Sequence, residues 1–230
     1  MPLNKKIIPY GHQWIDKKDI EEVVKVLKSD WLTQGPVIEE FEKAVAKYCG
    51  AKYGVAFSSG TAALYCAYRS AGIKQGDEVI TSPLTFAATS NMLAMLGAVP
   101  IFADVDEETL TIDSKEIEKK ITKKTKAIVA IDFAGHPCEY DEILKIAKKN
   151  NLFLIEDACH ALGAEYKGKK IGSFADMTVL SFHPVKHITT GEGGMVLTNN
   201  KDFYEKLKLF RNHGIEKKPE NGTWYYEILE

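Results

Sequence analysis

Apolar residues near the start of the chain recur at the spacing of a helix. Between Ile20 and Leu27 they fall three and four residues apart, and Asp16 just before them has the side chain of an N-cap residue. A second apolar stripe begins at Pro36, a residue that favours the first turn of a helix, and ends at Gly50, a residue that favours the turn after one. The pattern predicts two helices before residue 51.

Beyond residue 50 the pattern changes to short apolar runs that alternate with helical stripes. The runs are rich in β-branched residues and predict strands at 53–57, 78–82, 99–102, 127–133, 152–156, 177–182 and 195–198. The helical stripes between them lie at 62–71, 85–96, 114–120, 140–149 and 203–211. This alternation predicts an α/β domain with a mostly parallel central sheet and flanking helices. In such a sheet, ligands bind at the carboxyl ends of the strands.

Composition narrows the class of protein. Of the 230 residues 45% are hydrophobic, enough for a sizeable core, and the net charge of −2 gives no general reason to bind nucleic acid or a membrane surface. The N-terminal residues lack the apolar segment of a secretory signal, and no apolar run reaches the roughly 18 residues of a membrane-spanning helix. The four cysteines form no C-x-x-C pair, which is typical of free thiols in a reducing compartment. We therefore expect a cytoplasmic protein.

The end of the chain predicts a domain boundary. A polar stretch, 214–222, is followed by a cluster of aromatic and aliphatic residues at 224–229, which would be exposed if nothing covered it. We expect residues 1–50 to form an N-terminal arm and helices packed on the large domain, which is formed by residues 51–213. Residues 214–230 are expected to begin a loop that leads to a small C-terminal domain absent from this chain.

The first candidate site is the segment Ser58-Ser59-Gly60-Thr61-Ala62, which follows a predicted strand and opens a helix. Backbone N–H groups at such a turn point outward, and the helix N-terminus favours a negative charge, so the segment could bind a phosphate. An ordinary strand-to-helix turn with a capping hydroxyl would look the same.

The second candidate site is the end of an apolar strand, where Glu156 and Asp157 are followed by His160. Successive side chains of a strand alternate between faces, and Asp157 is the one that best reaches the mouth of the sheet. A carboxylate there could bind a metal, a ribose or a protonated heterocyclic nitrogen. It could equally be a helix cap.

The third candidate site is Lys186, which lies between a predicted strand and a glycine-rich loop. Its amine could bond covalently to a carbonyl cofactor once it has lost a proton, and Ser181 upstream could donate to a phosphate. A solvated loop lysine is the alternative. We expect no metal, because Pro184 disfavours a helix that would present His183 and His187 on one side, and no further ligands stand nearby.

Aromatic and polar residues elsewhere could complete a site. Phe86 follows a predicted strand in P-L-T-F and could stack on a flat ring, although a lone aromatic is more often part of a core. Tyr10 and the segment 31–35 could line a sugar site, or they could belong to an arm packed across the domain.

Taken in order, four motifs resemble those of a known family. They are S-S-G-T-A (58–62), P-L-T-F (83–86), E-D-A-C-H-A-L-G-A (156–164) and S-F-H-P-V-K-H-I-T-T-G-E-G-G (181–194). The set is similar to the DegT/StrS family of sugar-nucleotide aminotransferases. Members have the aspartate-aminotransferase fold, which is fold type I of the enzymes that use pyridoxal 5′-phosphate (PLP). Each motif is weak alone, whereas four in the right order are specific.

The resemblance implies a role for each candidate residue. Lys186 would hold PLP covalently and move the proton during transfer, and Asp157 would pair with the pyridine nitrogen. His160 would lie near the phenolic side of the ring, and Phe86 would stack on it. The remaining implied roles are phosphate contacts by Gly60, Thr61, Ala62 and Ser181, and sugar-nucleotide contacts by Tyr10, Thr33 and Gln34.

Four segments resemble one branch of the family most closely. They are P-Y-G-H-Q-W-I-D (9–16), S-D-W-L-T-Q-G-P (29–36), F-A-G-H-P-C (133–138) and the motif around Lys186. Members of that branch, which act in pseudaminic-acid biosynthesis, transfer an amino group from L-glutamate to C4 of a UDP-linked 4-keto-6-deoxy N-acetyl sugar. The family also implies a homodimer with a shared active site and a small C-terminal domain.

Two other functions stay open. A PLP-dependent sugar dehydratase would share the fold, but relatives of that kind have histidine where this chain has Lys186. An inactive family fragment that acts as a binding module would need neither Asp157 nor Lys186.

Overall fold

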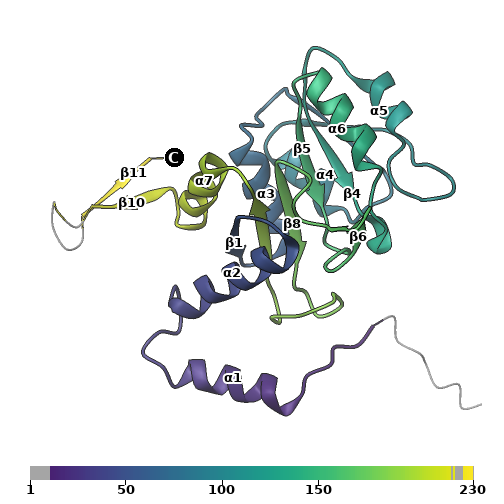
Figure 1. The fold of residues 1–230 in the computed structure, drawn as a ribbon. Helices are drawn as coiled ribbons and strands as arrows, with labels where there is room; N and C mark the ends of the chain where they lie inside the picture. Colours follow the sequence, from purple (N-terminus) through teal and green to yellow (C-terminus); the bar gives the residue numbers. More distant parts are fainter. Residues whose placement is uncertain (1–10, 219, 221–224, 230) are drawn as a thin grey trace, which may run out of the picture.

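The computed structural model describes residues 11–218, 220 and 225–229. Its centre is a seven-stranded sheet in the order β1-β9-β8-β5-β4-β2-β3 (Figure 1). The strands are β1 (Tyr53–Phe57), β2 (Glu78–Thr81), β3 (Val99–Phe102), β4 (Thr125–Ile131), β5 (Phe153–Asp157), β8 (Met177–Ser181) and β9 (Gly194–Thr198). All neighbouring strands are parallel except β9, which is antiparallel to both β1 and β8. The predicted α/β class with a mostly parallel sheet is confirmed.

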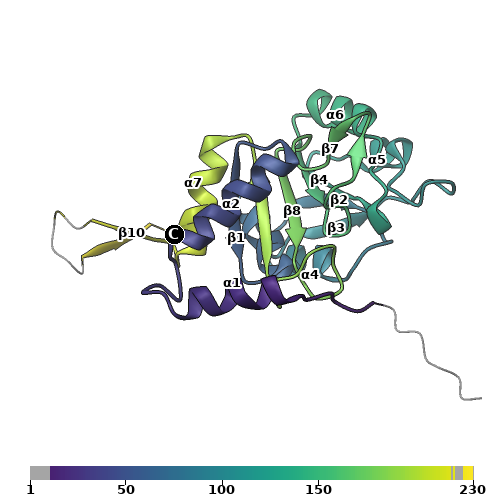
Figure 2. The ribbon, with the colours of Figure 1, turned by 60° about the horizontal axis from the view of Figure 1, so that its bottom comes forward.

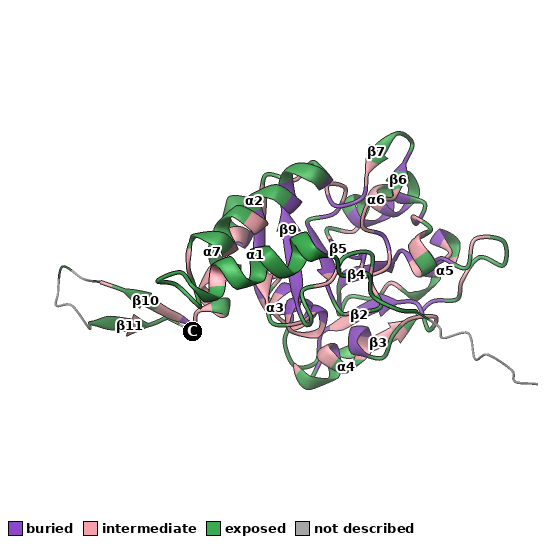
Figure 3. Cartoon of the chain, turned by 90° about the horizontal axis from the view of Figure 1, so that it is seen from below, coloured by how far each residue is buried: buried purple, intermediate pink, exposed green. Residues whose placement is uncertain are grey.

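Helices α2 to α7 cover both faces of this sheet, whereas α1 lies away from it. The helices are α1 (Lys17–Leu27), α2 (Pro36–Cys49), α3 (Gly60–Ser70), α4 (Ala88–Met95), α5 (Ser114–Lys120), α6 (Tyr140–Lys149) and α7 (Lys201–Arg211), with a short 3₁₀ turn, η1 (Phe133–Gly135). One apolar core joins α2, α5 and α6 to the sheet, and a second joins α3, α4 and α7 to its other face. The burial colouring of Figure 3 shows the strands as the buried layer between them.

The two N-terminal helices begin and end where the sequence predicts. Asp16 caps α1 by accepting from the amides of Lys18 (2.7 Å) and Asp19 (3.1 Å), and Asp19 bonds back to the amide of Asp16. Pro36 opens α2, and Gly50 closes it with a left-handed φ of 74°. Local sequence therefore fixes these boundaries.

The sequence predicts that both N-terminal helices pack on the large domain. The packing of α2 agrees with this prediction, and that of α1 differs from it. The helix α2 lies on β1 and buries Val45, Ala46 and Cys49. In contrast, α1 buries none of its residues, and Trp14 just before it is 88% exposed (Figure 3). The apolar stripe that predicts α1 thus has no covering surface among the described residues.

The end of the chain also differs from the expected loop. Ile215–Lys217 (β10) and Tyr226–Ile228 (β11) pair as an antiparallel hairpin that projects beyond α7 (Figures 1 and 2). Ile215 and Ile228 lie directly opposite each other in this hairpin. A cross-strand pair of aliphatic side chains stabilises such a pairing. A second small hairpin, β6 (Glu165–Tyr166) and β7 (Lys169–Lys170), was not predicted.

Two kinds of feature, a membrane-spanning helix and a metal-binding cluster, are absent from the described residues. No helix there has the length and apolar character to cross a bilayer. No cluster of three or more histidine, cysteine, aspartate or glutamate side chains is arranged there to hold a metal ion.

Candidate functional site

The candidate residues converge because several strands point the same way. The strands β1 and β8 are both antiparallel to β9 and so run in one direction, and β5 is parallel to β8. Their carboxyl ends therefore meet at one edge of the sheet, where parallel sheets bind ligands. The turn at Ser59, the carboxyl group of Asp157 and the hydroxyl group of Ser181 all belong to this edge.

The turn into α3 has the geometry of an anion site. Ser59 is the N-cap, and its Oγ accepts from the amide of Ala62 at 3.1 Å. The amides of Gly60 and Thr61 occupy the first two positions of α3, which have no acceptor within a helix. The amide of Ala62 is taken by Ser59, so of the three predicted contacts the amides of Gly60 and Thr61 are the ones available to a ligand.

Ser181 lies directly against this turn. A Cβ atom added at Gly60 would be 2.9 Å from the Cβ of Ser181 and 3.2 Å from its Oγ, so only glycine lets the two segments approach this closely. The structure thus brings together Gly60, Thr61 and Ser181, which the sequence assigned to one phosphate. Gly194 of β9 fits in the same way, because its added Cβ would lie 2.6 Å from the amide nitrogen of Gly60.

Asp157 is buried at the end of β5 with 6% of its surface exposed. One carboxylate oxygen accepts from the hydroxyl of Thr89 at 2.8 Å, and the other accepts from the amide of Cys159 at 3.3 Å. A buried carboxylate with so few donors is well suited to a cationic partner. Phe86, in the turn just before α4, is 71% exposed, so its ring is free to contact a ligand.

Lys186 stands in a turn that its own loop holds in place. The amide of Lys186 donates to the carbonyl of His183 at 2.9 Å, and the amide of Thr190 closes the loop by donating to the carbonyl of Phe182 at 3.0 Å. Burial raises the pKa of the Cys159 thiol and lowers that of His160, and the positive charge of Lys186 shifts both pKa values downward. Lys186 follows β8, which is parallel to β5, so its loop lies at the sheet edge that carries Asp157.

His160 has a half-buried ring next to Phe133, with the ring centroids 6.2 Å apart. Burial lowers the pKa of His160, and the positive charges of Lys186 and His187 lower it further, while Asp157 acts in the opposite direction. The balance favours a neutral imidazole near pH 7, which can both donate and accept a hydrogen bond.

These groups fit PLP by the chemistry of their donors. The glycine-tight turn offers outward amides for a phosphate, Asp157 offers a buried carboxylate for a protonated ring nitrogen, and Lys186 offers an amine for an aldehyde. Each of the three groups matches a different part of the cofactor.

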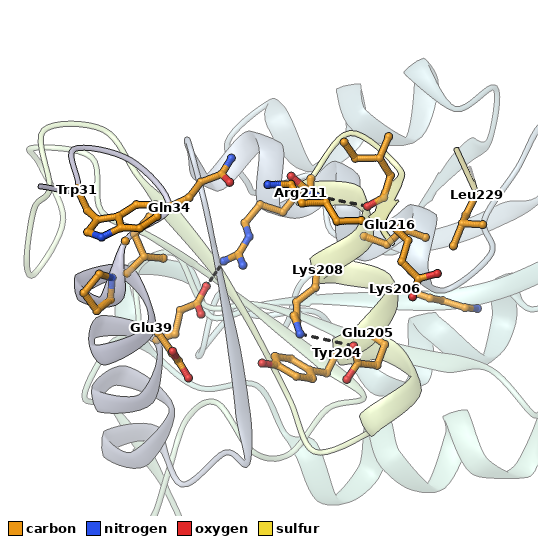
Figure 4. Close-up of a pocket in the computed structure, with 18 residues that line it drawn as sticks. Trp31, Gln34, Glu39, Tyr204, Glu205, Lys206, Lys208, Arg211, Glu216 and Leu229 are labelled. Carbon is orange, nitrogen blue, oxygen red and sulfur yellow. Dashed lines mark hydrogen bonds and ion pairs between the residues drawn. The ribbon is translucent and has the colours of Figure 1, made fainter. Parts of the chain in front are cut away.

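The predicted sugar contacts lie elsewhere. Gln34 lines a cavity of about 1060 Å³ between the start of α2 and α7 (Figure 4). Trp31 and Glu39 lie on one side of it, and Tyr204 and Lys208 lie on the other. None of the residues at the carboxyl edge of the sheet lines this cavity.

The other two predicted sugar contacts are Thr33 and Tyr10. Thr33 is exposed, and Tyr10 falls outside the described residues. The role of all three residues stays a prediction.

The structure adds site residues that the sequence analysis missed. Thr89 holds Asp157, Phe133 packs against His160, and Gly194 admits the turn at Gly60. The sequence holds a weak signal for Thr89, because Thr85 and Thr89 stand four residues apart in a predicted helix. In the structure their hydroxyls form a hydrogen bond of 2.9 Å.

Comparison with known proteins gives one consistent result. Residues 13–228 match the model of the DegT/DnrJ/EryC1/StrS aminotransferase family. A UDP-4-amino-4,6-dideoxy-N-acetyl-beta-L-altrosamine transaminase from Campylobacter jejuni is 49% identical over 227 residues, which cover 97% of this chain and 59% of that protein. The chain therefore spans about three fifths of the length of this curated relative.

Solved structures agree with the sequence relatives. Helicobacter pylori PseC, an aminotransferase involved in the biosynthesis of pseudoaminic acid, superimposes with a TM-score of 0.93 at 42% identity, covering 98% of this chain and 60% of that one. The PLP form of a sugar aminotransferase candidate from Streptococcus pneumoniae superimposes with a TM-score of 0.90 at 33% identity, covering 97% of this chain and 61% of that one.

Proposed function

Because this chain belongs to the DegT/DnrJ/EryC1/StrS aminotransferase family, we propose that its protein is a PLP-dependent sugar-nucleotide aminotransferase. The observation that supports the proposal is the arrangement at one sheet edge, where the amides of Gly60 and Thr61 and the buried carboxylate of Asp157 lie at strand ends and Lys186 stands in the loop after β8. A scaffold without catalysis would need none of them in this arrangement.

PLP, when bound, draws electrons from the carbon that loses or gains a proton during amino transfer. Asp157 would keep a proton on the ring nitrogen, and Thr89 and the amide of Cys159 hold that carboxylate in place. The turn at Gly60 and Thr61, together with Ser181, would bind the phosphate.

Lys186 has two tasks in the proposed reaction. Its Nζ would hold the cofactor between turnovers, and as a free amine it would take a proton from the donor amino acid and return one to C4 of the sugar. The neutral ring of His160 would be able to hydrogen-bond a phenolic oxygen of the cofactor. Phe86, exposed before α4, would cover one side of the ring and exclude water from it.

Borohydride reduction tests the cofactor site. The protein incubated with PLP and then reduced should carry a stable adduct on the peptide that contains Lys186, detected by mass spectrometry. The variant Lys186→Ala should lack the adduct. The control Lys167→Ala removes an exposed turn lysine that pairs with Asp141 and should keep it. An adduct found only at other lysines would contradict the proposal.

For the substrate, we propose that the amino group passes from L-glutamate to C4 of a UDP-linked 4-keto-6-deoxy N-acetyl sugar. The support is the 49% identity to the Campylobacter transaminase and the similarity to PseC. Incubation with the keto sugar and ¹⁵N-glutamate should give 2-oxoglutarate and a sugar labelled at C4. A deoxygenated ketone would instead indicate a dehydratase, and no turnover by a protein that binds PLP would indicate a binding module.

We also propose that the protein works as a cytoplasmic homodimer with a shared active site. The support is the family resemblance, together with the uncovered apolar stripe of α1, which needs a covering surface. Sedimentation equilibrium would show a species of twice the chain mass. A monomer at micromolar concentration with full activity would contradict this proposal.

A further inference from the structure

Behind the candidate site lie two buried carboxyl groups that the proposed reaction does not use. Asp132 follows the last residue of β4, and Glu156 is the residue before Asp157 in β5; both side chains are completely buried. Ala130 is opposite Glu156 in the sheet, so Asp132, two residues further along, projects from the same face as Glu156. That face is the one opposite the face from which Asp157 projects.

Each carboxyl group has one satisfied and one unsatisfied oxygen. Oδ1 of Asp132 accepts from the hydroxyl of Tyr140 at 2.7 Å and from the amide of Cys138 at 3.0 Å, and Oε2 of Glu156 accepts from the hydroxyl of Thr178. Oδ2 of Asp132 and Oε1 of Glu156 have no partner with hydrogen-bond geometry, although the hydroxyl of Tyr140 and the amide of Gly172 are near enough to Glu156 to lower its pKa, against the larger effect of burial, which raises it. Two fully buried acceptors without a donor would cost considerable free energy.

The charges around the pair offer no compensation. The titratable groups that act on the two carboxyls or respond to them are Cys138 and Tyr140, and Cys49 from α2, whose pKa values are all raised by burial, so these groups are neutral. None of the ion pairs among the described residues involves either carboxyl. Two ionised carboxylates in this position would repel each other without any cation to offset them.

From this geometry we propose that Asp132 and Glu156 share one proton at neutral pH and that the pair positions the floor of the active site. A single proton between Oδ2 and Oε1 turns one of them into a donor and so satisfies both. Burial and mutual repulsion raise the pKa of Asp132 well above its ordinary value, in agreement with this arrangement.

The pair acts on the site through the segments that it fastens. The amide of Asp132 donates to the carbonyl of Asp157 at 3.1 Å, so the end of β4 is tied to the strand end that carries the ring partner. By capping Cys138 and Tyr140, Asp132 also closes the loop that holds Phe133 against His160. Both residues are therefore positioning residues.

A buried shared proton can be detected without cofactor or substrate. In the infrared spectrum, the wild-type protein at about pH 7.5 should show the carbonyl stretch of a protonated carboxyl, well above the pH at which Asp and Glu ordinarily ionise. Glu156→Gln supplies an amide N–H in place of the proton and should lose the band. The control Glu42→Gln removes another buried carboxyl, the one that pairs with Arg211, and should keep the band. If Glu156→Gln does not fold, Asp132→Asn replaces it with the same expectation.

Stability gives an independent measurement. The ordinary pKa values are 3.8 for Asp and 4.5 for Glu. Above them the unfolded chain has lost its protons while the folded wild type keeps one extra. The folding equilibrium constant of the wild type should therefore fall about tenfold per pH unit relative to that of Glu156→Gln, until the pH passes the raised pKa of the pair.

Positioning is tested on His160. Its ring resonances, assigned with a His160→Asn variant, should move in Glu156→Leu, which leaves Asp132 without a proton partner, and should return to wild-type values in Glu156→Gln. Absence of a protonated carboxyl above pH 7, its persistence in Glu156→Gln, or unchanged His160 resonances in Glu156→Leu would each overturn the proposal. These measurements use the cofactor-free protein, so they stand or fall separately from the proposed function.

Discussion

A single hydroxyl, that of Thr89, helps to hold the carboxylate of Asp157, which we propose as the partner of the ring nitrogen. Asp157 is buried and accepts from the Thr89 side chain and from the amide of Cys159, and the thiol of Cys159 also lies within bonding reach. The hydroxyl of Thr89 also bonds Thr85, so its direction is fixed by the neighbouring turn of α4. The geometry of the carboxylate thus depends on a residue outside the proposed cofactor contacts.

Removing that hydroxyl should weaken cofactor binding. Thr89→Val keeps the shape of the side chain but removes the donor to Asp157, and a hydrogen bond to a charged group contributes about 1.5–3 kcal/mol. We expect the Kd for PLP to rise by about tenfold or more, measured by absorbance titration.

The neighbouring hydroxyl provides the control for this prediction. Ser90→Ala removes the hydroxyl of the next residue on α4, which donates to the carbonyl of Ala87 at 3.3 Å, and should leave PLP binding unchanged. Equal PLP affinities for Thr89→Val and the wild type would show that Cys159 alone holds the carboxylate.

At the scale of elements, hydrophobic periodicity and capping residues predicted the helices and strands that depend on nearby sequence. The predicted strands and helices of the main sheet are all present, with bounds that agree to within three residues, because apolar spacing and capping residues act within a few positions. The antiparallel direction of β9 and the hairpin at β10 could not be predicted, since strand direction depends on where distant segments pack. Likewise, Asp157 and Lys186 could be proposed from motifs, but the donor Thr89 and the carboxyl partner Asp132 depend on tertiary contacts.

The first residue of β9 should tolerate no side chain. A Cβ atom at Gly194 would collide with the carbonyl of Ser59 and the amide of Gly60. Because both are backbone atoms at a fixed turn, Gly194→Ala should lower the free energy of unfolding by about 1–3 kcal/mol and displace the anion-binding amides. Chemical denaturation would measure the loss.

A glycine in open surroundings serves as the comparison for Gly194. Gly11→Ala adds a Cβ atom whose nearest neighbour, in Val185, is 3.9 Å away, and should cost little. Similar stability of the two variants would mean that the turn at Ser59 can move.

The exposed helix α1 should respond to its cap alone. Asp16→Ala removes two hydrogen bonds at the N-terminus, which typically costs about 1 kcal/mol of helix stability. Since α1 buries no residue against its own chain, its amides in the monomer should exchange with solvent about five times faster while the Tm of the monomer stays the same. A lowered Tm would show instead that α1 is packed on the domain in solution.

At the scale of the whole molecule, one ion pair joins distant parts of the chain. Glu42 of α2 pairs with Arg211 at the end of α7, and it also accepts from the amide of Ala56 in β1 at 2.7 Å. The two helices pack against β1, the edge strand of the sheet, from opposite faces. The carboxylate of Glu42 is nearly buried, so it depends on both partners.

Loss of Arg211 should therefore destabilise the chain more than loss of a surface pair. Arg211→Met leaves the Glu42 carboxylate without its cation, and an uncompensated buried charge costs about 3–5 kcal/mol. We expect Arg211→Met to lower the free energy of unfolding by an amount near the lower end of this range, because the Arg211 side chain is about one third exposed.

A surface ion pair gives the reference value for this comparison. Lys149→Met, which breaks the exposed pair with Glu118, should cost under about 1 kcal/mol. If urea denaturation gave equal losses of unfolding free energy for Arg211→Met and Lys149→Met, the Glu42 carboxylate would have to be in contact with water.

The position of β9 also sets an order of events during synthesis. Tyr53 of β1 finds its sheet partner only at Thr198, so β1 and the anion-binding turn that follows it stay unpaired while the intervening chain leaves the ribosome. At about 5–20 residues per second this wait lasts roughly 7–30 s. During that interval the edge of β8 is open too, since β9 pairs with both strands. A nascent chain paused before Gly194 would therefore present two unpaired strand edges to chaperones, and one released after Thr198 would present neither.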